Sequence, residues 1–335
     1  MNATEWLNAL RETAQKPAIP ILSFPSVSLL GINVQELVSS EDLQAGGMKA
    51  ISERVPSGAA VSMMDLSVEA EAFGSAVRFD PMDVPAVTNI IVHNEAEARA
   101  LEVPSVGAGR TGLYISAIAK AARLIQDRPV FAGMIGPFSL SGRLLGVSET
   151  LLYCYDDPEL VEIVMEKATR FLIDYALAYK QTGALGVVIA EPLTGLLSPA
   201  LAQEVSHPFV KQIIDAVQDE NFLVVYHNCG DSASKMVDSL VKLGARAYHF
   251  GNKANMLEVM RQLPADIIGM GNVDPSSQFR NGTPQSIYES TTNLLRECGS
   301  YRNFVPSSGC DIPPATSWEN IESFFAAVED FYKTV

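Results

Sequence analysis

The sequence predicts a (β/α)8 barrel of the TIM type, formed by residues 1–335 as a single domain with helical additions at the N-terminus. Short apolar runs alternate with longer helical patterns along the chain, and such runs are typical of parallel strands that are covered on both faces. Alternating strands and helices indicate a parallel sheet with right-handed crossovers. One α/β barrel domain can reach this length.

The number of candidate strands fits a closed barrel better than an open sheet. The eight strands are residues 18–24, 58–64, 129–135, 186–190, 222–226, 245–248, 265–270 and 302–306. Helical patterns include residues 158–182 and 232–243, and the second ends at Gly244, a residue type that favours helix termination. An open, doubly wound sheet is the main alternative. It would need a glycine-rich turn of the form G-x-G-x-x-G after an early strand, and we expect no such turn in this chain.

The composition is globular and disfavours two classes of partner. Hydrophobic residues make up 47% of the chain and charged residues 19%. With a net charge of −15, the chain has too few basic residues in excess to form the positively charged face that binding a nucleic acid requires. No apolar run reaches the roughly 18 residues that a membrane span needs. Charges at Glu5, Arg11 and Glu12 indicate that the N-terminal segment is an amphipathic helix and not a signal peptide.

The cysteine count points to a reducing compartment. Cys154, Cys229, Cys298 and Cys310 are too few for a disulfide framework in a chain of this length, so we expect a cytoplasmic protein. Cys154 lies in an apolar helical stretch and Cys298 near a helix end, and both are predicted to fill space. The other two remain candidates for chemistry.

Polar or special residues follow most of the predicted strands. Asp65, Glu191, His227, His249 and Asn272 each stand where an apolar run ends. In a parallel barrel the carboxyl ends of the strands form one rim, and active sites lie there. The sequence therefore predicts a functional site at this rim.

His227 and Cys229 form the sharpest local motif. Two residues apart on an extended strand, they point to the same side and can contact one ion. Cys310 follows the last predicted strand, which brings it to the same rim. One imidazole and two thiolates with an open fourth position are typical of catalytic zinc, and sulfur ligands favour zinc over magnesium or calcium. Taken alone, a His-x-Cys pair is more often simply buried.

Two carboxylates are predicted to be catalytic from their position at the rim. Glu191 is a candidate fourth metal ligand, or an acceptor for the ring N–H of His227. The alternative is a structural carboxylate that caps a helix starting after Pro192. Asp65 is a similar but weaker candidate. His93 and His207 lack a partner at metal-binding spacing.

Three segments, read together, resemble one known family. They are residues 225–230 (VYHNCG), 271–284 (GNVDPSSQFRNGTP) and 307–321 (SSGCDIPPATSWENI). They resemble the uroporphyrinogen decarboxylase superfamily, and most closely its methylcobalamin:coenzyme M methyltransferase branch. Residues 64–74, 133–146 and 190–199 also match, so the resemblance covers nearly the whole chain. It implies a distorted (β/α)8 barrel and a His-x-Cys…Cys zinc motif, which His227, Cys229 and Cys310 match one for one.

The resemblance implies a zinc-dependent methyltransferase that moves a methyl group from a methyl-Co(III) corrinoid to a thiol such as coenzyme M. Corrinoid-binding modules of the relevant type carry Asp-x-His-x-x-Gly. The single His-x-x-Gly here, His227 to Gly230, is preceded by Val225 at the Asp position. We therefore expect the corrinoid to arrive on a separate partner protein.

Three alternatives remain open. Methyl transfer could run in reverse, from a methylated substrate to a corrinoid protein, and the thiol could be coenzyme M, homocysteine or another. A metal-free decarboxylase acting on a tetrapyrrole is the second alternative. The decarboxylases carry an Arg-rich segment of the form M-R-Q-A-G-R near the N-terminus, whereas residues 17–35 contain no arginine. The third is a barrel that binds without catalysis.

Overall fold

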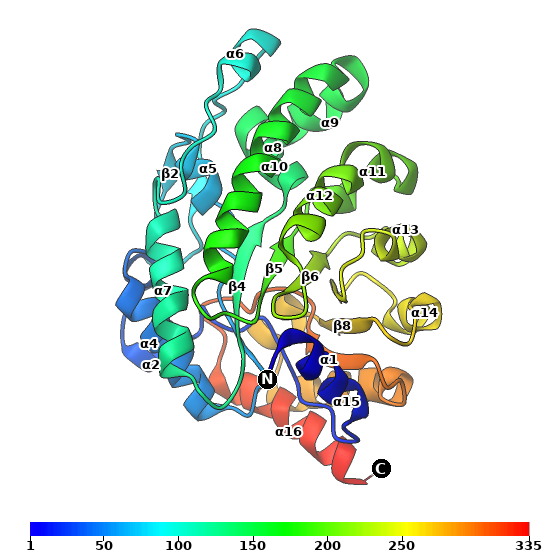
Figure 1. Ribbon diagram of the computed structural model, residues 1–335. Helices are drawn as coiled ribbons and strands as arrows, with labels where there is room; N and C mark the ends of the chain where they lie inside the picture. The colour runs from blue at the N-terminus through cyan, green and yellow to red at the C-terminus, as the bar shows by residue number, and fades with distance from the viewer. Residues whose placement is uncertain (335) are drawn as a thin grey trace.

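The computed structural model describes residues 1–334, which form a curled, seven-stranded parallel sheet surrounded by helices (Figure 1). Neighbouring strands follow chain order, and every pair is parallel. The strands are β1 (Ala60–Val61), β4 (Val130–Ile135), β5 (Gly186–Ala190), β6 (Leu223–Asn228), β7 (Ala247–Phe250), β8 (Ile268–Val273) and β9 (Phe304–Ser308). The barrel class predicted from the sequence is confirmed.

Sixteen α-helices are assigned within residues 1–334, and helices that follow the strands of the sheet cover its outside. They are α1 (Ala3–Glu12), α2 (Ser26–Leu30), α3 (Val34–Val38), α4 (Glu41–Arg54), α5 (Val68–Ala72), α6 (Glu95–Ala100), α7 (Thr111–Leu124), α8 (Pro137–Leu145), α9 (Val147–Asp156), α10 (Pro158–Lys180), α11 (Pro199–Val205), α12 (His207–Val217), α13 (Val237–Val241), α14 (Met256–Gln262), α15 (Pro284–Cys298) and α16 (Trp318–Thr334). None of these helices is long and apolar enough to cross a membrane.

Local sequence explains where the longest helix begins. Asp157 accepts a hydrogen bond from the Leu160 backbone N–H, and Pro158 occupies the first helical position of α10, where its missing N–H costs nothing. The predicted helix 232–243 is instead a 3-10 turn, Ala233–Lys235, followed by the short α13.

The eighth predicted strand, residues 18–24, is not a regular strand. It nevertheless occupies the eighth place in the barrel. The Ile19 N–H donates to the Pro306 carbonyl of β9 at 2.9 Å, and the Gly58 N–H donates to the Ala18 carbonyl at 2.9 Å. Pro17 and Pro20 flank Ile19 and have no N–H to donate, so a continuous ladder cannot form. An irregular segment therefore closes the barrel.

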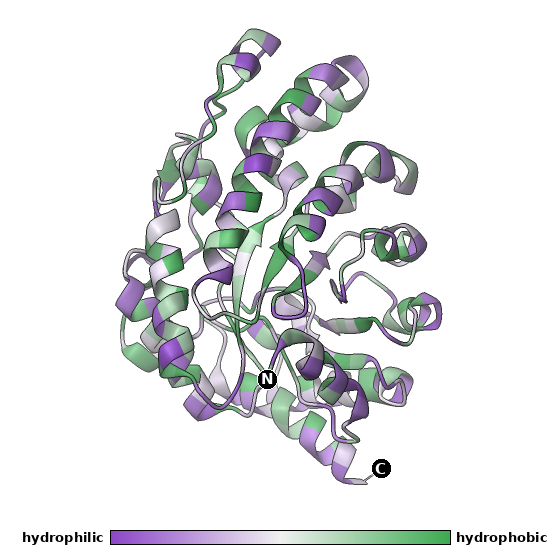
Figure 2. Cartoon of the chain, in the orientation of Figure 1, coloured by the Kyte–Doolittle hydropathy of each residue, from purple (hydrophilic) through white to green (hydrophobic). Residues whose placement is uncertain are grey.

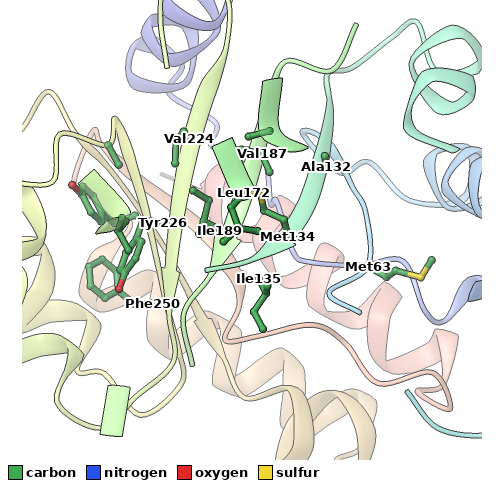
Figure 3. Close-up of a cluster of buried hydrophobic side chains, with 14 of the residues drawn as sticks. Met63, Ala132, Met134, Ile135, Leu172, Val187, Ile189, Val224, Tyr226 and Phe250 are labelled. Atoms are coloured by element: carbon green, nitrogen blue, oxygen red, sulfur yellow. The ribbon is translucent and has the colours of Figure 1, made fainter. Parts of the chain in front are cut away.

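Alternation along the strands separates an outer apolar layer from an inner one. Outward side chains such as Val187, Ile189, Val224 and Tyr226 pack against the helices (Figure 3). The inner layer includes Val188 and Val225 and is joined by buried residues of α1. Apolar colouring is concentrated on the strands, while many helices carry polar residues on one side (Figure 2).

Helix α1 covers the amino-terminal end of the barrel. Trp6 packs on Phe131 with 5.2 Å between ring centroids, and Leu7 and Leu10 are buried beside them. The carboxyl ends of the strands lie at the opposite end of the barrel from α1, where active sites of such barrels are found.

Residues 75–110 form an excursion between β1 and β4. It contains the antiparallel pair β2 (Val77–Arg78) and β3 (Ala86–Val87), then α6, which projects at the top of Figure 1. The chain does contain a G-x-G-x-x-G spacing, at residues 107–112, but this segment lies between α6 and α7. Since no strand precedes it directly, it is not the turn that a doubly wound nucleotide-binding fold requires.

Candidate metal centre

The three predicted metal ligands lie at the carboxyl ends of β6 and β9. Alternation along β6 places Val225 and His227 on the inner face and Tyr226 on the outer face. Cys229 follows β6 directly, and Cys310 comes two residues after β9 ends. Parallel strands bring these ends to one rim although they are far apart in sequence.

The possible ligand atoms of His227, Cys229 and Cys310 all lie within 4.8 Å of one another. The Cys310 Sγ is 3.6 Å from the His227 Nε2. His227 is 1% exposed, whereas both cysteines are half-buried. One imidazole and two thiols at this spacing fit a tetrahedral zinc site with one position left for a substrate.

The two thiols differ in their electrostatics. A hydrogen bond from the Cys310 thiol lowers the pKa of Cys229 below its ordinary value. The same hydrogen bond, together with burial, raises the pKa of Cys310 to about 12. Cys229 is thus the thiol that ionises first and can offer a thiolate to a cation.

Close backbone packing holds the rim loops in place. A Cβ added at Gly230 would lie 2.1 Å from the Cα of Gly195, in the loop after β5. A Cβ added at Gly251 would lie 2.4 Å from the Cα of Cys229. Only glycine fits at such approaches, so the loops after β5, β6 and β7 fix the position of Cys229.

Both cysteines face a cavity of about 720 Å³. Its other lining residues include Leu196 and Leu197 after β5 and Lys253 after β7. The cavity therefore joins the sulfur pair, an apolar wall and a cationic side chain. It can hold a small molecule whose sulfur reaches the candidate metal position.

The back of the His227 ring contacts a second buried histidine. The Nδ1 atoms of His227 and His249 are 2.7 Å apart, and the Nε2 of His249 is 2.8 Å from the Ser307 Oγ. Burial, and then the neighbouring His227, lower the pKa of His249 well below its ordinary value. His249 was only a minor candidate in the sequence, and Ser307 was not a candidate.

Glu191 lies in a different network. Its carboxylate accepts hydrogen bonds from the Phe138 N–H at 2.8 Å, from the Ser139 N–H at 3.1 Å, from the Ser139 hydroxyl at 2.8 Å and from Thr194 at 3.0 Å. It thus serves the amino-terminal end of α8, and not a helix after Pro192. Burial raises the pKa of Glu191 to about 7 despite these donors. The Nδ1 of His227 contacts the Nδ1 of His249 instead of Glu191.

Asp65 is held in a buried ion pair. Its Oδ2 is 2.5 Å from the Arg110 guanidinium and 2.7 Å from the Tyr114 hydroxyl. Burial opposes the charge of Arg110, but Asp65 keeps the pKa of Arg110 above its ordinary value. Neither Asp65 nor Glu191 lines the cavity beside the two cysteines. The structure therefore brings together the three predicted metal ligands and puts the two predicted catalytic carboxylates in separate networks.

Comparison with known proteins gives a consistent picture. A family model described as uroporphyrinogen decarboxylase (URO-D) matches residues 21–331. A methylcobamide:CoM methyltransferase MtbA of Methanosarcina acetivorans is 26% identical over 271 residues, which cover 80% of this chain and 78% of that protein. A uroporphyrinogen decarboxylase of Coxiella burnetii is 24% identical over 290 residues, which cover 83% and 78%. A solved structure described as a methyltransferase from Methanosarcina mazei has the same fold, with a TM-score of 0.86 at 22% identity over 99% of both chains.

Proposed function

The chain belongs to the uroporphyrinogen decarboxylase family, and within that family we propose that it is a zinc-dependent corrinoid methyltransferase. The reaction would move a methyl group from a methyl-Co(III) corrinoid protein to a small thiol such as coenzyme M. Similarity to a methylcobamide:CoM methyltransferase over four-fifths of the chain supports this proposal.

One observation carries the proposal, namely the cluster of His227, Cys229 and Cys310 beside the 720 Å³ cavity. Family membership alone does not decide between activities, because a uroporphyrinogen decarboxylase is also similar to this chain. Two thiols and an imidazole that converge on one point have a clear use in thiol chemistry. A metal-free decarboxylation would leave them without a role.

The chain's residues would bind, orient and shield the reacting thiol. A zinc ion at the cluster would supply the positive charge that keeps a coordinated thiol deprotonated at neutral pH. The half-buried cysteines leave one side of the cluster open to the cavity. Leu196 and Leu197 give part of the cavity wall an apolar surface, and Lys253 offers a cation to an anionic tail of the substrate.

The corrinoid would dock at the rim as part of a separate protein, since the chain lacks the Asp-x-His-x-x-Gly motif. Docking would fix the methyl group opposite the sulfur and make the transfer effectively unimolecular. The corrinoid itself carries the difficult organometallic chemistry.

The test combines metal analysis with a methyl-transfer assay. The purified protein should contain about one zinc per chain, the stoichiometry of a single catalytic site. With methylcobalamin and a thiol, it should cause loss of the methyl-Co(III) absorption, and faster loss with a methylated corrinoid protein. Coenzyme M, homocysteine and an uncharged thiol are compared, because their relative rates identify the acceptor.

Substitutions in the cluster provide the matched controls. Cys229→Ser and Cys310→Ser should each lose most of the zinc and the activity while the fold is retained. Cys298→Ser, in the buried side of α15, should keep both. Stoichiometric zinc in both rim variants would contradict the ligand assignment. If zinc is bound but no thiol is methylated, transfer from a methylated substrate to a Co(I) corrinoid becomes the better proposal.

A further inference from the structure

A line of three polar side chains runs across the inside of the barrel behind the candidate metal ligands. The strand register pairs His227 of β6 with His249 of β7, and Ser307 lies on β9. The side-chain contacts are 2.7 Å between the two Nδ1 atoms and 2.8 Å from the His249 Nε2 to the Ser307 Oγ. The His227 Nδ1 also lies 3.3 Å from the His249 backbone carbonyl oxygen. His227, His249 and Ser307 are at most 2% exposed.

Two nitrogen atoms in contact at 2.7 Å must share one hydrogen, so only two arrangements of neutral rings are possible. In the first, the His227 Nδ1–H donates to the His249 Nδ1, and the His249 Nε2–H donates to Ser307. The His227 Nε2 then presents a lone pair to Cys310, 3.6 Å away. In the second arrangement His249 donates to His227, and the His227 Nε2 carries a hydrogen that blocks ligation.

The surroundings of His249 offer few other partners. The small cavity that its ring lines is otherwise bounded by apolar side chains. These are Trp6, Ile19, Ile21, Val61, Phe131, Val188, Val225 and Met270. Both arrangements give each ring nitrogen a partner, because the Ser307 hydroxyl can donate or accept. The His249 backbone carbonyl can only accept, and its position 3.3 Å from the His227 Nδ1 favours the first arrangement, in which that nitrogen carries the hydrogen.

We propose that His249 is a positioning residue that holds His227 in the tautomer whose Nε2 lone pair faces the two cysteines, with Ser307 as the terminal acceptor. This inference rests on the proposed zinc site and deepens it. His249 itself touches neither the metal position nor the cavity beside the cysteines. Groups of this kind orient histidine ligands, and their loss typically lowers metal affinity by about 10- to 100-fold.

Isosteric substitutions at residue 249 test which ring nitrogen matters. In His249→Asn the amide oxygen stands close to the position of Nδ1 and can still accept from His227. In His249→Gln the amide stands near the position of Nε2. His249→Leu removes both ring nitrogens and leaves the His227 Nδ1 only the longer contact to the backbone carbonyl of residue 249. Zinc affinity, measured by competition with a chromophoric chelator, should stay within about threefold in His249→Asn and fall about 10- to 100-fold in the other two.

Cobalt(II) substitution gives a spectroscopic signature of the same site. The intense visible bands of tetrahedral thiolate coordination should be retained in His249→Asn and weakened in His249→Gln and His249→Leu. His207→Gln is the matched control, because His207 is a buried histidine at the start of α12 and lies outside the cluster. Its affinity and spectrum should equal those of the wild type, and thermal unfolding of each variant reports on the fold.

Nitrogen NMR of the metal-free protein separates this inference from the proposed function. The chain has four histidines, so ¹⁵N-histidine labelling gives a spectrum that single substitutions can assign. His227 should carry its hydrogen on Nδ1 in the wild type and in His249→Asn. In His249→Leu the spectrum should show a mixture of the two neutral tautomers of His227. A wild type that binds no zinc would contradict the zinc site, and the tautomer of His227 would still test the role of His249.

Two results would overturn the role of His249. One is an unchanged zinc affinity and an unchanged His227 tautomer in a folded His249→Leu variant. The other is an equal loss in His249→Asn and His249→Leu, because the acceptor at the Nδ1 position would then have no effect.

Discussion

Glu191 should make the protein less stable as the pH rises from 5 to 8. Its ordinary pKa is 4.5, and burial raises the pKa to about 7 in the folded state. Between these values the folded protein keeps a proton that the unfolded chain has lost, so the free energy of unfolding falls with rising pH. At about 1.4 kcal/mol per pKa unit, this contribution is about 3 kcal/mol; it is present below pH 4.5 and lost above pH 7.

Glu191→Gln removes the titration while nearly preserving the shape of the side chain. Its amide oxygen can accept from the Phe138 N–H, but its NH2 group faces the Ser139 N–H, which would lose its acceptor. This mismatch should cost about 1–3 kcal/mol at low pH. At pH 8 the variant should be less destabilised, or as stable as the wild type, because it buries no charge.

Urea unfolding at pH 5 and pH 8, with the metal removed, measures the difference. The stability of the wild type relative to Glu191→Gln should fall by about 3 kcal/mol between these pH values. Glu204→Gln, on the exposed side of α11, is the control and should leave the pH dependence unchanged. Equal pH dependence in the wild type and Glu191→Gln would refute the reasoning. Zinc affinity should be retained in Glu191→Gln, because the carboxylate serves α8 and not the cluster.

Two further predictions concern the substrate and the second buried carboxylate. Adding a thiol substrate to the zinc-loaded protein should release about one proton per site at neutral pH, since the metal binds the thiolate. Calorimetry in buffers of different ionisation enthalpy measures the number of protons released. Tight binding without proton release would mean that the sulfur does not reach the metal. Arg110→Met should destabilise the protein by about 3–5 kcal/mol in urea unfolding, because Asp65 is left buried without its ion-pair partner; a loss below about 1 kcal/mol would contradict that role.

The sequence predicted the barrel because its strands have a strong local signature. The apolar runs 129–135 and 186–190 correspond closely to β4 and β5, which are buried throughout. Residues 18–24 have the same apolar character, but Pro20 within this run and Pro17 just before it remove hydrogen-bond donors. Apolar content alone therefore indicates a buried position in the barrel. A regular strand also needs backbone N–H groups for the hydrogen-bond ladder, and prolines lack them.

The convergence of the three candidate ligands could be predicted because its geometry is local. His227 and Cys229 share a side because they stand two apart at the end of one strand, and Cys310 joins them because parallel strands end at one rim. Glu191 was placed at the rim correctly, yet its partners on α8 come from a segment more than fifty residues away. No pattern around Glu191 identifies those partners, so the sequence could not separate a ligand from a helix-capping carboxylate.

The pairing of His227 with His249 depends on how β6 and β7 are aligned in the sheet, and the residues around either histidine do not identify the other as its partner. The apolar residues of β6 and β7 set this register, because their inner and outer sets must face the correct layers. A slip of one residue in β7 would turn His249 outward toward the helices and bring Tyr248 or Phe250 into the barrel. The convergence of the candidate metal ligands thus follows from the ends of two strands, whereas the proposed tautomer of His227 depends on how β6, β7 and β9 are aligned. Core substitutions in these strands should therefore change metal affinity without touching a ligand.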